Sequence, residues 1–86
     1  MEVAYVLVKS DVAHEMDVLN EILKIDGVKE VKGTFGLYDI FVKIEAASGK
    51  ELQKIITKKI RHLKHVLSTT TLSVIPEQGG SDKLKN

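Results

Sequence analysis

The amino-acid sequence predicts an α+β domain in which strands and helices follow the order β-α-β-β-α-β. Three observations lead to this order. Runs of β-branched residues mark four strands, and apolar residues at three- and four-residue spacing mark one helix in each half of the chain. The length of 86 residues fits one small domain with a thin core. The domain is expected to cover residues 1–76, with a flexible C-terminal tail over residues 77–86.

The first strand is expected over residues 2–9, because Val3 to Val8 form an uninterrupted apolar run between charged side chains. Both alternating faces of this run are apolar, which is typical of a strand that is covered on two sides. A helix is expected over roughly residues 12–25, and Asp26-Gly27 ends it, since glycine readily takes the left-handed conformation found after helices. The apolar stripe of this helix consists of Val12, Met16, Leu19, Ile22 and Leu23.

A β-hairpin is expected in the middle of the chain. Val28 to Lys32 form its first strand, Gly33 to Gly36 its bend, and Leu37 to Glu45 its second strand. The second strand alternates in polarity, so its two faces should carry different side chains. One face is predicted to hold Tyr38, Ile40, Val42 and Ile44, and the other Asp39, Phe41, Lys43 and Glu45.

The second half of the chain repeats the pattern of the first. Ser48 and Glu51 have the spacing of a capping box and start a helix expected over roughly residues 49–64. The last strand is expected from Val66 to Ile75, and Pro76 ends it.

Together these elements form two similar halves in the ferredoxin-like arrangement. Right-handed crossovers place both helices on one face of a four-stranded antiparallel sheet. The other face then carries apolar side chains of the first strand, together with Phe41, without a covering layer. An exposed apolar sheet face is usually an interface, so the sequence predicts dimers formed through this face. The alternative is a monomer with an apolar surface.

Composition narrows the classes of function. The net charge of +1 argues against a bulk electrostatic attraction to nucleic acid, and no apolar run is long enough to span a membrane. The absence of cysteine excludes disulfides and thiol catalysis. No signal peptide precedes Val3, so a cytoplasmic location is expected.

No motif predicts catalysis, a cofactor or a metal site, and the chain is expected not to be an enzyme. His62 and His65 have a spacing that can chelate a metal, but no cysteine or carboxylate cluster completes a ligand set, so both are expected to be solvated. Gly33 to Gly36 match the GXXG pattern of RNA-binding KH domains. That loop joins helices in KH folds and strands here, so no direct contact with nucleic acid is expected.

One acidic residue, Asp39, is unusual because aspartate is disfavoured in strands. By alternation it shares the expected interface face with Phe41, where a carboxylate needs a cation or a hydrogen-bond donor. Thr69 to Thr71 lie on the last strand of the same sheet, and their hydroxyls can donate and accept hydrogen bonds. On composition alone, the simpler interpretation is a water-facing aspartate and threonines chosen for their β-propensity.

The segment Thr34-Phe35-Gly36-Leu37-Tyr38-Asp39-Ile40 resembles the Thr-Gly-x-Tyr-Asp hairpin of the leucine-responsive regulatory protein/AsnC family, with Phe35 as one extra residue. Ala4 to Val8, Gly27 to Val31, and Val66 to Thr71 resemble further parts of the same module in the same order. The resemblance covers residues 2–76 and is to the RAM domain, named for regulation of amino-acid metabolism.

This resemblance implies an assembly and a ligand. Full-length members carry a helix-turn-helix DNA-binding domain before the module, whereas here the first strand begins at Val3, so a stand-alone RAM domain is expected. RAM domains form sheet-to-sheet dimers that assemble into rings such as octamers or decamers, and small amino acids bind between dimers near the hairpin. The resemblance implies ligand-binding roles for Gly36, Tyr38, Asp39, Thr69, Thr70 and Thr71.

The expected function is therefore a non-enzymatic, homo-oligomeric amino-acid-binding module for transcription regulation, with full-length family regulators as further partners. Two alternatives stay open. One is a small dimeric α+β-barrel enzyme, monooxygenase-like or isomerase-like, and the other is an oligomerisation partner without a ligand. Such enzymes place a His, Tyr or Asp between helices and sheet, where this sequence places Leu, Ile and Val.

Overall fold

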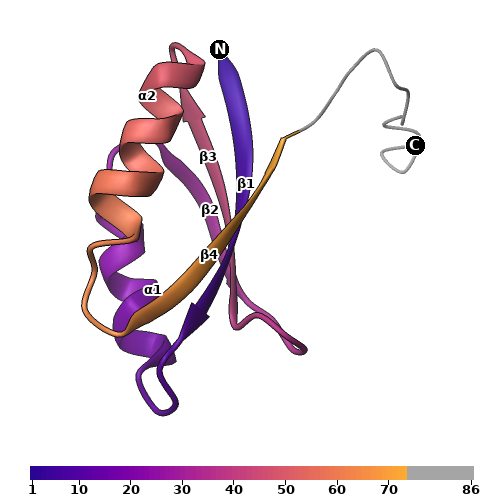
Figure 1. The fold of residues 1–86 in the computed structure, drawn as a ribbon, viewed down its shortest axis with the longest axis vertical. Helices are drawn as coiled ribbons and strands as arrows, with labels where there is room; N and C mark the ends of the chain where they lie inside the picture. The colour runs from indigo at the N-terminus through magenta and orange to yellow at the C-terminus, as the bar shows by residue number, and fades with distance from the viewer. Residues whose placement is uncertain (74–86) are drawn as a thin grey trace.

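A computed structural model describes residues 1–73 and has the expected order of strands and helices (Figure 1). Two helical segments lie on one face of the sheet: α1 (Glu15–Leu23), and α2 (Gly49–Lys54) with its continuation η1 (Ile55–Ile60). The predicted ferredoxin-like α+β fold is confirmed. The four strands pair in the order β2-β3-β1-β4, where β1 is Glu2–Ser10, β2 is Val28–Gly33, β3 is Ile40–Ala46 and β4 is Val66–Ser73.

Part of the sequence prediction lies outside the described residues. This part consists of the last two residues expected in the final strand, the proline that ends it, and the expected tail over residues 77–86.

Strand β1 is the centre of the sheet, because it pairs antiparallel with β3 on one side and β4 on the other. Val6, for example, lies opposite Val42 on β3 and opposite Thr71 on β4. Val6 is buried against the helices, whereas the neighbouring Tyr5 and Leu7 are half-buried on the opposite face. We call this opposite side of the sheet the open face, since no helix within residues 1–73 covers it.

The core lies between the sheet and the helices. Among residues 1–73, Ser10 is the only buried polar side chain; every other buried side chain is apolar. The apolar contacts link the two central strands to both helical segments, which explains why burial stabilises the whole fold together. The buried apolar residues are Ala4, Val6, Val8, Val18, Ile22, Ile40, Val42, Ile44, Leu52, Ile56 and Ile60.

Helix α1 is shorter than the sequence predicted. It begins at Glu15 rather than near residue 12, because Ala13 has a φ of 72° and turns the chain before the helix. Its end agrees with the prediction, since Gly27 has a φ of 95° just past the helix.

The second helical segment begins as predicted, and Ser48 Oγ accepts a hydrogen bond from the Glu51 N–H at 3.2 Å. From Ile55 to Ile60, however, it is a π-helix rather than an α-helix. The buried residues of the whole segment recur at four-residue spacing and face the sheet. They are Leu52, Ile56 and Ile60.

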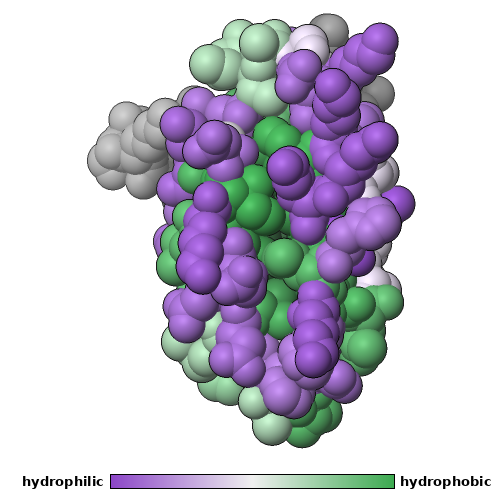
Figure 2. Space-filling model, turned by 90° about the vertical axis from the view of Figure 1, so that its left-hand side faces the viewer, coloured by the Kyte–Doolittle hydropathy of each residue, from purple (hydrophilic) through white to green (hydrophobic). Residues whose placement is uncertain are grey.

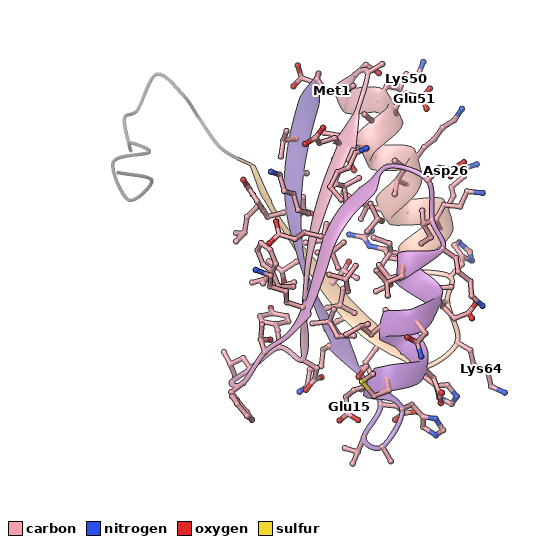
Figure 3. All side chains as sticks on the ribbon, turned by 180° about the vertical axis from the view of Figure 1, so that it is seen from behind. Met1, Glu15, Asp26, Lys50, Glu51 and Lys64 are labelled. Carbon is pink, nitrogen blue, oxygen red and sulfur yellow. The ribbon has the colours of Figure 1, made fainter. Side chains whose placement is uncertain are left out.

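The outer surface of the helical layer is charged. Figure 2 shows an apolar strip between bands of hydrophilic side chains on this face. Lys50 and Lys64, near the two ends of the second helical segment, point away from the body of the molecule (Figure 3). Within residues 1–73, no helix has the length and apolar character that crossing a membrane requires.

Gly27 allows a test of how tightly the turn after α1 packs. A Cβ at this position would lie 2.9 Å from Ile55 Cδ1 and 3.0 Å from the Glu45 carbonyl oxygen, and its φ is unfavourable for alanine. Gly27→Ala is therefore expected to lower the free energy of unfolding by about 1–3 kcal/mol, measured by urea denaturation. Gly49→Ala is the control, because a Cβ there meets open space; its stability should stay the same or rise by up to about 1 kcal/mol. Equal losses in both variants would contradict this role for Gly27.

Candidate functional site

The hairpin between β2 and β3 carries three of the predicted ligand residues. β3 begins at Ile40, so the residues before it form a loop instead of the predicted strand. Gly36 has a φ of 117°, in the left-handed region that favours glycine. Thr34 closes the loop: its N–H donates to the Asp39 carbonyl at 2.8 Å and its Oγ1 donates to the Tyr38 carbonyl at 2.8 Å.

The late start of β3 changes the face on which Tyr38 lies. Alternation placed it with Ile40, toward the helices, but its hydroxyl oxygen lies 2.7 Å from Thr70 Oγ1. Thr70 is opposite Leu7 of β1, and side chains opposite each other share one face of a sheet. Tyr38 therefore lies on the open face, because a strand alternation does not continue through a loop.

Asp39 has a partner that the sequence did not identify. Its Oδ2 accepts a hydrogen bond from the Ser10 N–H at 2.9 Å, and its own N–H donates to the Val8 carbonyl at 2.9 Å. The carboxylate thus satisfies a backbone donor where the pairing of β1 with β3 ends. Its second oxygen, Oδ1, has no hydrogen-bond partner within residues 1–73.

Lys9 also lies at the hairpin, although the sequence did not identify it as a site residue. Its Nζ donates to the Leu37 carbonyl oxygen at 3.3 Å, so its ammonium group lies at the hairpin. Continuing the alternation of Tyr5 and Leu7 by one step would have placed Lys9 on the open face. A cation and a carboxylate therefore flank the hairpin.

The three candidate threonines do not lie together. Thr70 contacts Tyr38 on the open face, whereas Thr69 and Thr71 lie opposite Val8 and Val6, on the helical side of the sheet. Thr69 Oγ1 accepts a hydrogen bond from Arg61 Nε at 2.9 Å, which ties it to the end of the second helical segment. Four of the six candidate residues therefore lie at the hairpin: Gly36, Tyr38, Asp39 and Thr70. Thr69 and Thr71 lie on the helical side of the sheet.

Next to the hairpin, the open face has an apolar centre. The rings of Tyr5 and Phe41 stack with centroids 5.6 Å apart and an interplanar angle of 27°. At the hairpin tip, Phe35 and Leu37 are strongly exposed. Large apolar side chains beside Lys9 and Asp39 form a surface suited to contact with another molecule.

A groove of about 760 Å³ lies on the opposite side of the molecule, between the helical segments (Figure 2). Ile25, Ile55 and Leu63 line this groove together with charged residues of both signs. No predicted ligand residue lines this groove.

His62 is exposed, as expected, whereas His65 differs from the expectation of a solvated side chain. The rings of His14 and His65 stack with centroids 3.6 Å apart, and His65 is half-buried. His65 Nδ1 lies 3.2 Å from Asp11 Oδ2, and His14 Nδ1 lies 3.1 Å from Asp17 Oδ2. Across residues 1–73, no group of three or more potential metal ligands is close enough to hold an ion.

Comparisons with known proteins agree on one family. The model of the Lrp/AsnC ligand binding domain matches residues 3–78. The chain is 38% identical over 72 residues to an uncharacterised HTH-type transcriptional regulator of Pyrococcus furiosus, and this match covers 80% of the chain and 48% of the regulator. The crystal structure of FFRP-DM1 superposes with a TM-score of 0.83 at 33% identity, covering 87% of this chain and 100% of that one.

A second type of relative is an enzyme. The chain is 41% identical over 73 residues to homocitrate synthase of Sulfolobus acidocaldarius, a match that covers 84% of the chain but 15% of the enzyme. The chain thus spans about half the length of the regulator and a small part of the synthase.

Asp39 allows a test of the hairpin. Asp39→Ala leaves the Ser10 N–H without its acceptor, which is expected to lower the free energy of unfolding by about 1–3 kcal/mol in urea denaturation. Asp39→Asn keeps an oxygen acceptor at the same place, so it should lose less than half as much. Similar losses for both variants would show that charge, rather than the hydrogen bond, holds the hairpin against β1.

Proposed function

The chain belongs to the Lrp/AsnC ligand binding domain family, and from this we propose that it is a non-enzymatic, homo-oligomeric sensor of a small amino acid. Regulators of transcription are among its relatives. In this proposal, the ligand changes how copies of the domain associate with one another and with full-length regulators of the family. The domain itself makes no contact with nucleic acid.

The presence of a cation and a carboxylate at the same hairpin carries the proposal. A free amino acid has an ammonium group and a carboxylate on one carbon atom, so it needs an acceptor and a donor close together. Asp39 Oδ1 is an acceptor available to the ammonium, and Lys9 Nζ is a donor available to the carboxylate. Around Gly36 a Cβ would meet no atom within 4 Å, so a ligand can approach the backbone of the bend.

The hydroxyl groups of Tyr38 and Thr70 add a polar wall to this site. They lie 2.7 Å apart, and each can also donate to or accept from a polar ligand group. The site is open to solvent in a single copy, and the exposed Phe35 and Leu37 are available to a neighbouring subunit. We therefore propose that a second subunit encloses the ligand.

The apolar open face supports assembly. Tyr5, Leu7 and Phe41 are half-buried there, and packing two such faces together would remove them from water. We propose dimers formed through this face, which then associate into rings such as octamers or decamers.

The two types of relative favour sensing over catalysis. Similar modules occur in an HTH-type regulator and in a homocitrate synthase, two proteins with different activities. The function that the modules share is therefore expected to be ligand sensing rather than catalysis of the synthase reaction. Within residues 1–73, the buried layer between helices and sheet is filled by apolar side chains, and Ser10 is its only buried polar residue. This filling disfavours a small α+β-barrel enzyme.

A thermal-shift screen of the twenty amino acids tests the sensor. At a concentration 100-fold above Kd, a ligand that binds only the native state raises the free energy of unfolding by about 2.7 kcal/mol. We expect a few amino acids to raise Tm clearly and the rest to leave it unchanged. A flat response to all twenty would instead support an oligomerisation partner without a ligand.

Two variants locate the site within that screen. Lys9→Met and Asp39→Asn should each reduce the Tm rise by at least half, because each removes one of the two charges. Lys54→Met on α2, an exposed lysine away from the hairpin, should keep the full response. An unchanged response in the first two variants would remove the hairpin from the site.

Light scattering tests the contact between open faces. The wild-type chain should have at least twice the 9.6 kDa mass of one copy, and Phe41→Lys should lower the mass of the assembly by placing a charge in the apolar face. Leu23→Lys, an exposed position on α1, is the control and should keep the wild-type mass. A wild-type mass of 9.6 kDa would contradict dimer formation.

A further inference from the structure

The two edge strands of the sheet differ in how they are protected. β2 is six residues long and carries Lys29, Glu30 and Lys32, and its pairing with β3 shifts register near its start. Lys32 Nζ lies 2.9 Å from Glu30 Oε1, and the hydrogen bond and charge of Lys32 hold the pKa of Glu30 below its ordinary value. Charges and irregular pairing are the usual means by which an edge strand avoids pairing with another chain.

β4, at the other edge, is less protected, although its pairing with β1 also shifts register near its start, between Lys9 and Ser10. Its eight residues, Val66–Ser73, include no charged side chain and no proline. Leu67 and Leu72 are 59% and 49% exposed, and the residues between them are serine and threonine. A long, uncharged edge strand of high β-propensity presents a ready surface for another strand.

The backbone directions identify which groups of β4 are available. The Val8 carbonyl accepts from the Asp39 N–H on the β3 side, and in an antiparallel strand the N–H and C=O of one residue point the same way. Thr69 lies opposite Val8, so its N–H and C=O point away from β1. The same holds for Thr71, opposite Val6. Within residues 1–73, no strand lies beyond this edge to pair with them.

We propose that β4 pairs antiparallel with β4 of a second copy, with Thr69 of each copy opposite Thr71 of the other. Each of these pairs then exchanges both N–H···O bonds, and Thr70 lies opposite its own equivalent. The two sheets join into one, with all helices on the same side. Because the same surface is used by both copies, the contact closes on itself.

A second copy fits this edge better than another strand would. Under this register every threonine meets a threonine, and such cross-strand pairs stabilise sheets. Pairing of β4 with a partner's β2 would place uncharged residues against Lys29, Glu30 and Lys32, and it would join two different edges rather than two identical ones. The contact does not depend on the ligand. Where dimers form through the open face, each has two β4 edges, so edge pairing would join dimers to one another.

A proline substitution tests the edge contact. In Thr71→Pro the outward N–H is lost, while the pairing of β4 with β1 keeps its hydrogen bonds, so the fold should persist. We expect light scattering to show that the assembly falls to the mass of the open-face dimer, whereas Thr71→Val, which keeps the N–H, should retain the full mass. Circular dichroism verifies folding. An unchanged mass in folded Thr71→Pro would overturn the proposal.

Disulfide trapping tests the contact without disturbing the backbone. The chain has no cysteine, so Thr70→Cys introduces a single thiol. Directly opposite residues of a non-hydrogen-bonded antiparallel pair have Cα atoms about 4.5 Å apart, within the range for a disulfide. Under mild oxidation, Thr70→Cys should form covalent dimers, and Lys29→Cys on the charged edge should remain monomeric on a non-reducing gel.

The trapping experiment is repeated in the Phe41→Lys chain, where the open-face contact is disrupted. Continued cross-linking of Thr70→Cys there supports edge pairing even if the open-face dimer or the amino-acid response fails. Cross-linking that disappears with Phe41→Lys would assign the contact to the open face and overturn the edge proposal.

Discussion

The apolar character of β1 on both of its faces is the constraint on which the rest of the structure depends. Two helical segments cover one face, where Ala4, Val6 and Val8 are fully removed from water. No third layer exists within residues 1–73 for Tyr5 and Leu7 on the other face. A domain of this size gains much of its possible stability from the surface it buries, so an uncovered apolar face favours association with another chain.

The candidate site is built onto the end of the same strand. Lys9 reaches the hairpin carbonyl of Leu37, and the Ser10 N–H is held by the Asp39 carboxylate. Across the open face, the Tyr38 hydroxyl meets Thr70 of β4. Hydrogen bonds therefore link the hairpin to β1 and, across the open face, to β4. A ligand that repositions the hairpin would act directly on the surfaces proposed for assembly.

Local sequence patterns predicted the elements well. Alternation separated the buried Val42 and Ile44 from Phe41 on the open face, and the spacing of Ser48 and Glu51 marked the start of the second helix. Gly27 marked the end of the first helix. These signals are reliable because each depends on the conformation of a few consecutive residues.

Features that depend on neighbouring elements were not predicted. Tyr38 lies on the open face because a hydrogen-bonded loop interrupts the alternation before Ile40. Ile55 to Ile60 form π-helical turns, which a helical spacing in the sequence does not distinguish from an α-helix. Lys9 joined the site because the hairpin folds back onto its strand.

The sequence by itself determined the order of the elements, the apolar faces of the central strands and the family to which the domain belongs. The tertiary structure alone decided which of the three threonines meets Tyr38, and which threonine backbone groups point out of the sheet. The reason is physical. Periodicity fixes how side chains alternate along a strand. Which N–H and C=O groups face a neighbouring strand, and which point out of the sheet, is determined only by how the strands pair.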